Sequence, residues 1–108
     1  MKRISISNFK EMKTPSDTLI EIIEIIKGKI TPDTDIVWTR YNSVEELNID
    51  LDKIINGILK NENDTFSKLE ILFAPTGSFQ ELSLTNGWGE EFLKLSEMFD
   101  DQIEKLKH

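Results

Sequence analysis

The chain has 108 residues, a formal net charge of −7 and no cysteine. This length favours a single domain, residues 1–108, with one hydrophobic core. The missing cysteines exclude disulfides, thiolate metal sites and cysteine nucleophiles. The acidic balance argues against nucleic acid and anionic membranes as partners, because both recruit lysine and arginine.

The acidic charge is unevenly placed: the first 30 residues hold six basic and four acidic side chains, the rest seven and sixteen. An acidic region of this kind attracts a basic protein, although the charge can also serve solubility alone. The start of the chain lacks the apolar core of a signal peptide. The run Leu19–Ile26 is too short for a membrane span and carries two glutamates. We therefore expect a cytoplasmic protein.

The first predicted elements are a short edge strand and a helix. Residues 2–7 alternate weakly, which favours the strand. A helix begins near Thr14, where Thr14 or Ser16 can cap it and Pro15 suits its first turn, and it ends near Gly28. Its apolar face comprises Leu19, Ile20, Ile22, Ile23 and Ile26.

Residues 35–41 are rich in β-branched and aromatic side chains, which predicts a strand with Trp38 buried. Ser43 and Glu46 then form a capping box, in which each side chain bonds the other residue's backbone N–H. The helix behind it runs to about Lys60. Its apolar positions are Val44, Leu47, Leu51, Ile54, Ile55 and Ile58.

Two more strands and a helix are predicted in the last third of the chain. Residues 69–74 are almost all apolar, which is typical of a central strand. A turn at 75–78 leads to a strand at 79–85 with Leu82 and Leu84 facing the core. Glycines around Trp88 turn the chain into a final helix. Its apolar stripe is Phe92, Leu95, Phe99, Ile103 and Leu106, extended by Leu93 and Met98.

The predicted order is (β)αβαββα, an α+β fold. A central β-α-β segment allows a parallel pair, and the next two strands form an antiparallel hairpin. We expect a small mixed sheet of three or four strands, with two or three helices packed mainly on one face.

No catalytic or metal-binding set stands out. The only histidine is His108, so no internal histidine activates a serine. Asp50 with Asp52, and Asp100 with Asp101, fall in predicted helices, where each successive side chain is turned by about 100°, so neither pair converges on one ion. A two-carboxylate glycosidase is compatible with the residue types, but a domain this small leaves little room for a sugar cleft. We expect no cofactor and no metal.

The candidate binding residues are Phe79, Glu81, Trp88, Glu90 and Glu91. If Leu82 and Leu84 face inward, Phe79 alternates outward beside Glu81, and an exposed aromatic cluster with acids is typical of a protein-binding hot spot. The alternative is that Phe79 closes the hairpin against a helix and that Trp88 packs over the corner. Asp50 and Asp52 form a second candidate patch.

The segment LFAPTGSFQELSLTNGWGEEFLKLSEMFD, residues 72–100, resembles small bacterial immunity proteins of contact-dependent inhibition and polymorphic toxin systems. The resemblance covers about the last third of the chain. It implies a single-domain cytoplasmic inhibitor that binds one cognate toxin domain, often a basic nuclease, and it transfers no residue-level function.

The leading hypothesis is therefore a non-enzymatic protein-binding domain, most concretely an immunity protein. One alternative is a homo-oligomeric structural or regulatory domain that buries the Ile-rich first helix and Phe79 between subunits. Another is a small-molecule-binding protein or an enzyme that uses carboxylates in a pocket.

Overall fold

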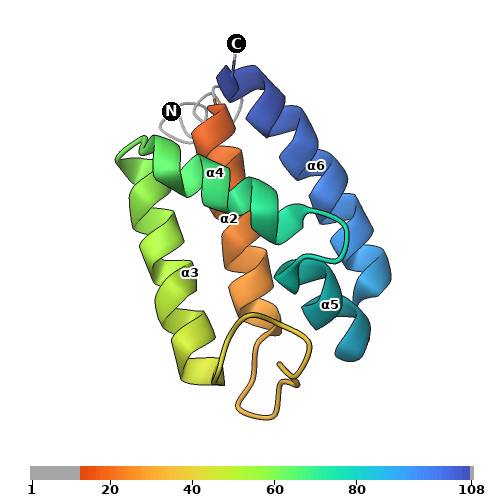
Figure 1. The fold of residues 1–108 in the computed structure, drawn as a ribbon. Helices are drawn as coiled ribbons and strands as arrows, with labels where there is room; N and C mark the ends of the chain where they lie inside the picture. Colours follow the sequence, from red (N-terminus) through yellow and green to blue (C-terminus); the bar gives the residue numbers. More distant parts are fainter. Residues whose placement is uncertain (1–12, 108) are drawn as a thin grey trace, which may run out of the picture.

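Residues 13–107, the part that the computed structural model describes, form five α-helices and no strand (Figure 1). The helices are α2 (Pro15–Lys29), α3 (Val44–Leu59), α4 (Asn63–Phe73), α5 (Ser78–Thr85) and α6 (Gly89–Lys107). The predicted α+β fold with a mixed sheet is therefore wrong for this part of the chain. The strand predicted at residues 2–7 lies outside the described residues.

The two strands predicted at 69–74 and 79–85 are helical because their apolar residues repeat every three or four positions. In α4 the buried side chains are Thr65, Leu69, Leu72 and Phe73, and Ile71 is exposed. In α5 Phe79 and Leu82 are buried, whereas Leu84 faces solvent. Read alone, the run 69–74 shows no period, and the helical repeat emerges only when residues 63–68 are included.

The strand predicted at 35–41 is a loop of turns. A strand needs a neighbour to satisfy its backbone, and the two other strands predicted within residues 13–107 are helices. The loop bonds locally instead: Thr39 N donates to Ile36 O at 2.9 Å, and Val37 N donates to the Asp35 carboxylate at 3.0 Å. Trp38, which we predicted to be buried, is 71% exposed.

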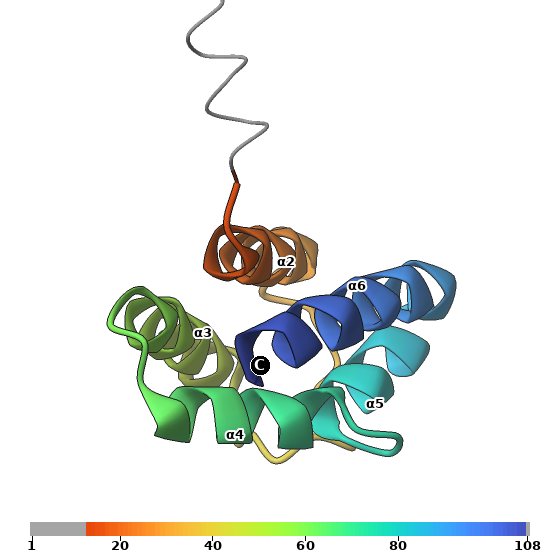
Figure 2. The ribbon, with the colours of Figure 1, turned by 90° about the horizontal axis from the view of Figure 1, so that it is seen from above.

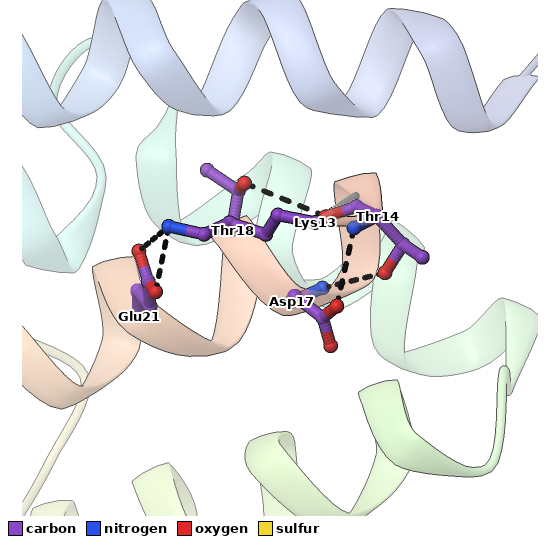
Figure 3. Close-up of polar contacts among 5 residues, drawn as sticks. All are labelled: Lys13, Thr14, Asp17, Thr18 and Glu21. Carbon is purple, nitrogen blue, oxygen red and sulfur yellow. Dashed lines mark hydrogen bonds and ion pairs between the residues drawn. The ribbon is translucent and has the colours of Figure 1, made fainter. Parts of the chain in front are cut away.

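The starts of the first two helices follow the sequence signals closely. Thr14 caps α2: Asp17 N donates to Thr14 Oγ1 and Thr14 N donates to the Asp17 carboxylate, both at 3.1 Å (Figure 3). Lys13, which precedes the helix, pairs with Glu21 on its second turn at 2.8 Å (Figure 3). The predicted end near Gly28 is confirmed, since α2 closes at Lys29, although Gly28 lies inside the last turn and Ile30 is the cap.

Ser43 caps α3 as predicted, accepting from Glu46 N at 3.0 Å. The second hydrogen bond of the predicted capping box, from the backbone N–H of Ser43 to the Glu46 carboxylate, is not formed. The Glu46 carboxylate accepts from the backbone N–H of Asn42 at 3.4 Å and from its side-chain amide at 3.3 Å, rather than from Ser43. The helix end near Lys60 is confirmed, since α3 closes at Leu59 with Lys60 as its cap.

The five helices enclose one apolar core. Helix α2 runs opposite to α3 and α6 and contacts both (Figure 1). Seen from above, α3 and α6 flank α2, while α4 and α5 close the opposite side (Figure 2). Phe73 at the end of α4 is the centre of an aromatic cluster, stacked on Phe99 at 4.2 Å and on Phe92 at 5.7 Å, with Phe79 edge-on at 5.1 Å.

Two glycines permit close approaches that any side chain would block. A Cβ at Gly57 would lie 1.9 Å from Thr65 Oγ1, so this residue lets α3 and α4 meet. A Cβ at Gly77 would lie 2.6 Å from Ile71 O. The predicted turn at 75–78 is present, with Gly77 N donating to Ala74 O at 2.8 Å. Its positive φ falls on Thr76 (65°), so Gly77 is needed for space rather than for its dihedral angle.

Candidate functional site

The most prominent surface feature is a groove along α6, which is called the α6 groove below. It consists of two hollows that share Gln80, Phe92 and Leu93. One, of about 500 Å³, lies at the α5–α6 corner, and the other, of about 340 Å³, lies between α4 and α6. Its lining residues come from α4, α5, α6 and the turns between them, and α5 lies beside α6 (Figures 1 and 2).

The floor and sides of the α6 groove are apolar. Trp88 and Phe92 form part of the floor, with their rings in edge-to-face contact at 6.5 Å. Leu84 and Leu93 stand at the edge and are 59% and 61% exposed. An apolar surface this open is a normal feature of a binding site and is unfavourable in contact with water.

The charged residues of the α6 groove are all acidic. Glu90 and Glu91 line the corner hollow, Glu70 and Asp100 line the other, and no lysine or arginine is among the described residues that line either. Glu91 is paired with Lys29 and Glu70 with Lys107, each at 2.6 Å. The side chains of Glu90 and Asp100 make no hydrogen bond or ion pair within residues 13–107. The groove therefore presents net negative charge beside apolar surface.

The predicted binding residues divide between the groove and the core. Glu90 and Glu91 line the corner hollow, and Trp88 forms its floor while remaining only 7% exposed. Phe79 is fully buried, so of the two alternatives left open for it, packing inside the molecule is the one observed. Glu81 is half-buried and lines neither hollow.

The second predicted patch does not form one surface. Asp50 lies in an internal polar cluster, where its carboxylate accepts from the Tyr41 hydroxyl at 2.6 Å and pairs with Lys68. Burial, followed by the hydrogen bond to Asp50, raises the pKa of Tyr41. Asp52 points elsewhere and pairs with Lys27 at 2.5 Å, and this hydrogen bond raises the pKa of Lys27.

Sequence reasoning missed the exposed apolar residues. Leu84 and Leu93 were assigned to the core, although both face solvent. On a helix whose buried face runs through Phe92, Leu95 and Phe99, Leu93 points about 100° away from Phe92. This offset is the signal that could have identified Leu93 as exposed. Trp38 had no comparable signal, because its exposure depends on a loop that follows no period.

Residues 13–107 contain no group of three or more histidine, cysteine, aspartate or glutamate side chains arranged to hold a metal ion. The helices in this range are also too short or too polar to cross a lipid bilayer. Comparison of the chain with protein-family models, curated proteins and solved structures gives no match.

Proposed function

We propose that this chain is a non-enzymatic protein-binding domain whose α6 groove takes an amphipathic, basic segment of a partner protein. The observation that carries the proposal is the combination of exposed leucines with charged lining residues that are all acidic. Burial of Leu84 and Leu93 against a partner supplies affinity, at about 25 cal/mol per Å² of apolar surface. The acids of the groove then select lysine and arginine over acidic competitors.

The dimensions of the groove suit a helix. Lining residues run along α6 from Gly89 to Ile103, which corresponds to about 21 Å or four helical turns. A partner helix of similar length can place apolar residues at helical spacing on Leu93 and basic residues beside Glu90 and Asp100. This is the helix-in-groove mode of recognition, in which a few apolar anchors at turn spacing determine the fit.

The biological role that we propose is that of an immunity protein, a cytoplasmic inhibitor that binds and neutralises a cognate toxin domain. The resemblance of residues 72–100 to such proteins motivates this role, and all residues that line the groove except Glu70 and Ile103 lie within this stretch. A basic toxin domain, such as a nuclease, has the charge that the acids of the groove attract. The absence of cysteine from the sequence agrees with a reducing compartment.

The test is affinity capture from the native host with wild-type protein and two matched variants. Leu93→Lys places a charge in the groove, whereas Leu59→Lys places the same charge at a residue of α3 that is 67% exposed. We expect a stoichiometric basic partner on the wild type and on Leu59→Lys, and its loss on Leu93→Lys. If Leu93→Lys still captures the partner, or if the captured partner is acidic, the groove is not the proposed binding site.

A homo-oligomer built on the first helix and Phe79 is disfavoured, because Leu19, Ile22, Ile23 and Ile26 are buried with Phe79 in the chain's own core. A small-molecule site has one favourable observation, since the corner hollow falls within the range of about 300–1,000 Å³ that is usual for ligand pockets. A ligand-dependent rise in melting temperature that Leu93→Lys abolishes would support it.

A further inference from the structure

The cations of this acidic chain are unequally paired. Within residues 13–107, lysines 13, 27, 29, 68, 105 and 107 each form an ion pair. Arg40, Lys53, Lys60 and Lys94 form none. Because acids outnumber bases by seven, a surface cation has many possible partners, so each unpaired one stands out. Two of these four, Arg40 and Lys53, line the same hollow.

This hollow, which is called the Arg40 hollow below, has a volume of about 220 Å³ and lies between the 30–43 loop and α3. Its two acids already have partners. Asp50 accepts from Tyr41 and pairs with Lys68, and its side chain is only 14% exposed. Glu46 accepts both hydrogen bonds that Asn42 donates. These hydrogen bonds leave the carboxylate charges in place, but the three cations of the lining (Arg40, Lys53 and Lys68) outnumber its two acids, so the hollow carries a net charge of +1.

The backbone around Arg40 is fixed before any ligand arrives. Arg40 N donates to Ser78 Oγ at 3.0 Å, which ties the loop to the start of α5. The next residue, Tyr41, is buried and bonded to Asp50. Lys53 lies on α3 one turn beyond the exposed Ile49, which forms an apolar wall of the hollow. Cations on a fixed backbone lose less freedom when they bind, which favours affinity.

We propose that the Arg40 hollow binds one small oxyanion, a phosphate or a carboxylate group, between Arg40 and Lys53. A volume of 220 Å³ corresponds to about seven waters, which suits a single anionic group and is below the range of drug-sized ligands. The arginine fork matches two oxygens of either anion, and the lysine contributes a point charge. This site is separate from the α6 groove and does not depend on the proposed function.

The test uses the full chain and two double variants with the same charge change. Arg40→Gln/Lys53→Gln removes both cations of the hollow, and Lys60→Gln/Lys94→Gln removes the two unpaired cations outside it. Inorganic phosphate and sodium acetate are titrated separately at constant ionic strength, with chloride as the balancing salt, and amide and arginine side-chain NMR shifts are followed. All four side chains are exposed, so both variants should keep the fold, which the amide spectra also check.

We expect saturable shifts around Arg40 and Lys53, at least tenfold weaker binding in Arg40→Gln/Lys53→Gln, and unchanged binding in the control variant. Phosphate binding that is tighter than its larger charge explains would favour a phosphate-bearing occupant, and equal or tighter binding of acetate would favour a carboxylate. Shifts that never saturate, or that persist in Arg40→Gln/Lys53→Gln, would show that only diffuse charge screening operates, and the proposal would be wrong.

Discussion

The two tryptophans sit in similar connections between helices but differ in exposure. Trp88 lies between α5 and α6, packs edge-to-face on Phe92, donates its backbone N–H to Ser83 O at 2.9 Å and is 7% exposed. Trp38 lies in the loop between α2 and α3 and is 71% exposed. Both connections are ordered by hydrogen bonds, so order alone does not bury an aromatic side chain. Burial depends on whether a neighbouring helix presents a surface to receive it.

One residue joins the two tryptophan-bearing connections. Asn86 precedes the Trp88 corner, and its side-chain amide donates to Asp35 O at 2.8 Å while its carbonyl oxygen accepts from Asp35 N at 2.9 Å. The side-chain bonds of Asn86 therefore hold the loop against the buried corner, in addition to the packing of Ile36 on the core. The two connections can be tested separately, by substitutions in the corner and in the loop.

The largest effect is expected from removal of the buried ring. Trp88→Ala should lower the free energy of unfolding by about 3–5 kcal/mol, because it leaves a cavity beside Phe92. Urea denaturation followed by circular dichroism measures the change. A loss below about 1 kcal/mol would mean that the corner collapses around the gap, and the contrast with Trp38 would fail.

The turn that leads to α5 should tolerate no added methyl group. Gly77→Ala should lower the free energy of unfolding by about 1–3 kcal/mol, because the new Cβ meets backbone carbonyls. Gly28→Ala is the matched control: nothing lies within 4 Å of its Cβ, and it should gain about 0.5–1 kcal/mol as an exposed helical position. Equal effects at both glycines would contradict the close approach at Gly77.

Asn86→Ala should loosen the loop that contains Trp38 without disturbing the corner that contains Trp88. The loss of its bonds to Asp35 should cost about 1–3 kcal/mol of stability and should increase hydrogen exchange at the Asp35 amide. Trp88 should stay buried, because its own contacts are unchanged. If acrylamide quenching of Trp88 rises together with exchange at Asp35, the corner and the loop are one cooperative unit rather than two.

The stability of the protein at high pH should depend on Tyr41, which is buried at the end of the loop that contains Trp38. The pKa of Tyr41 in the folded state is raised above its unfolded value of about 10, mainly by burial. Its stabilising contribution is therefore complete below pH about 10 and is lost as the pH rises above that value. The urea midpoint should fall above pH 10, and Tyr41→Phe, which removes the only tyrosine, should reduce that slope. An unchanged slope would contradict the buried hydroxyl.

The smallest effect is expected at the exposed ring. Trp38→Ala should change the free energy of unfolding by no more than about 0.5 kcal/mol. In single-tryptophan variants, acrylamide should quench Trp38 strongly and Trp88 weakly. Weak quenching of Trp38 would show that another surface covers it in solution.

The sequence predicted helices better where an amphipathic stripe was long and capped. Thr14 and Ser43 begin α2 and α3 as expected, and the stripe through Phe92 and Phe99 is buried in α6. The failures were α4 and α5, whose apolar runs are too short to distinguish a repeat of two from one of three or four. Their helical state also depends on packing against α3 and α6, which no local window contains.

The candidate site was predicted in part. Glu90 and Glu91 were chosen because they follow the Trp88 corner, and they do line the groove. Phe79 was expected to alternate along a strand, and a helix reverses that assignment because its neighbours in space are three and four residues away. Asp50 was taken for a surface acid, yet its partners Tyr41 and Lys68 come from distant segments.

Contact between the first and last described helices has a consequence for synthesis. The ion pair between Lys29 on α2 and Glu91 on α6 spans 62 residues of chain. At a translation rate of about 5–20 residues per second, α2 waits about 3–12 s for that partner to be made. During this interval α2 has α3 but not α6 to pack against. The core therefore closes only after α6 has emerged.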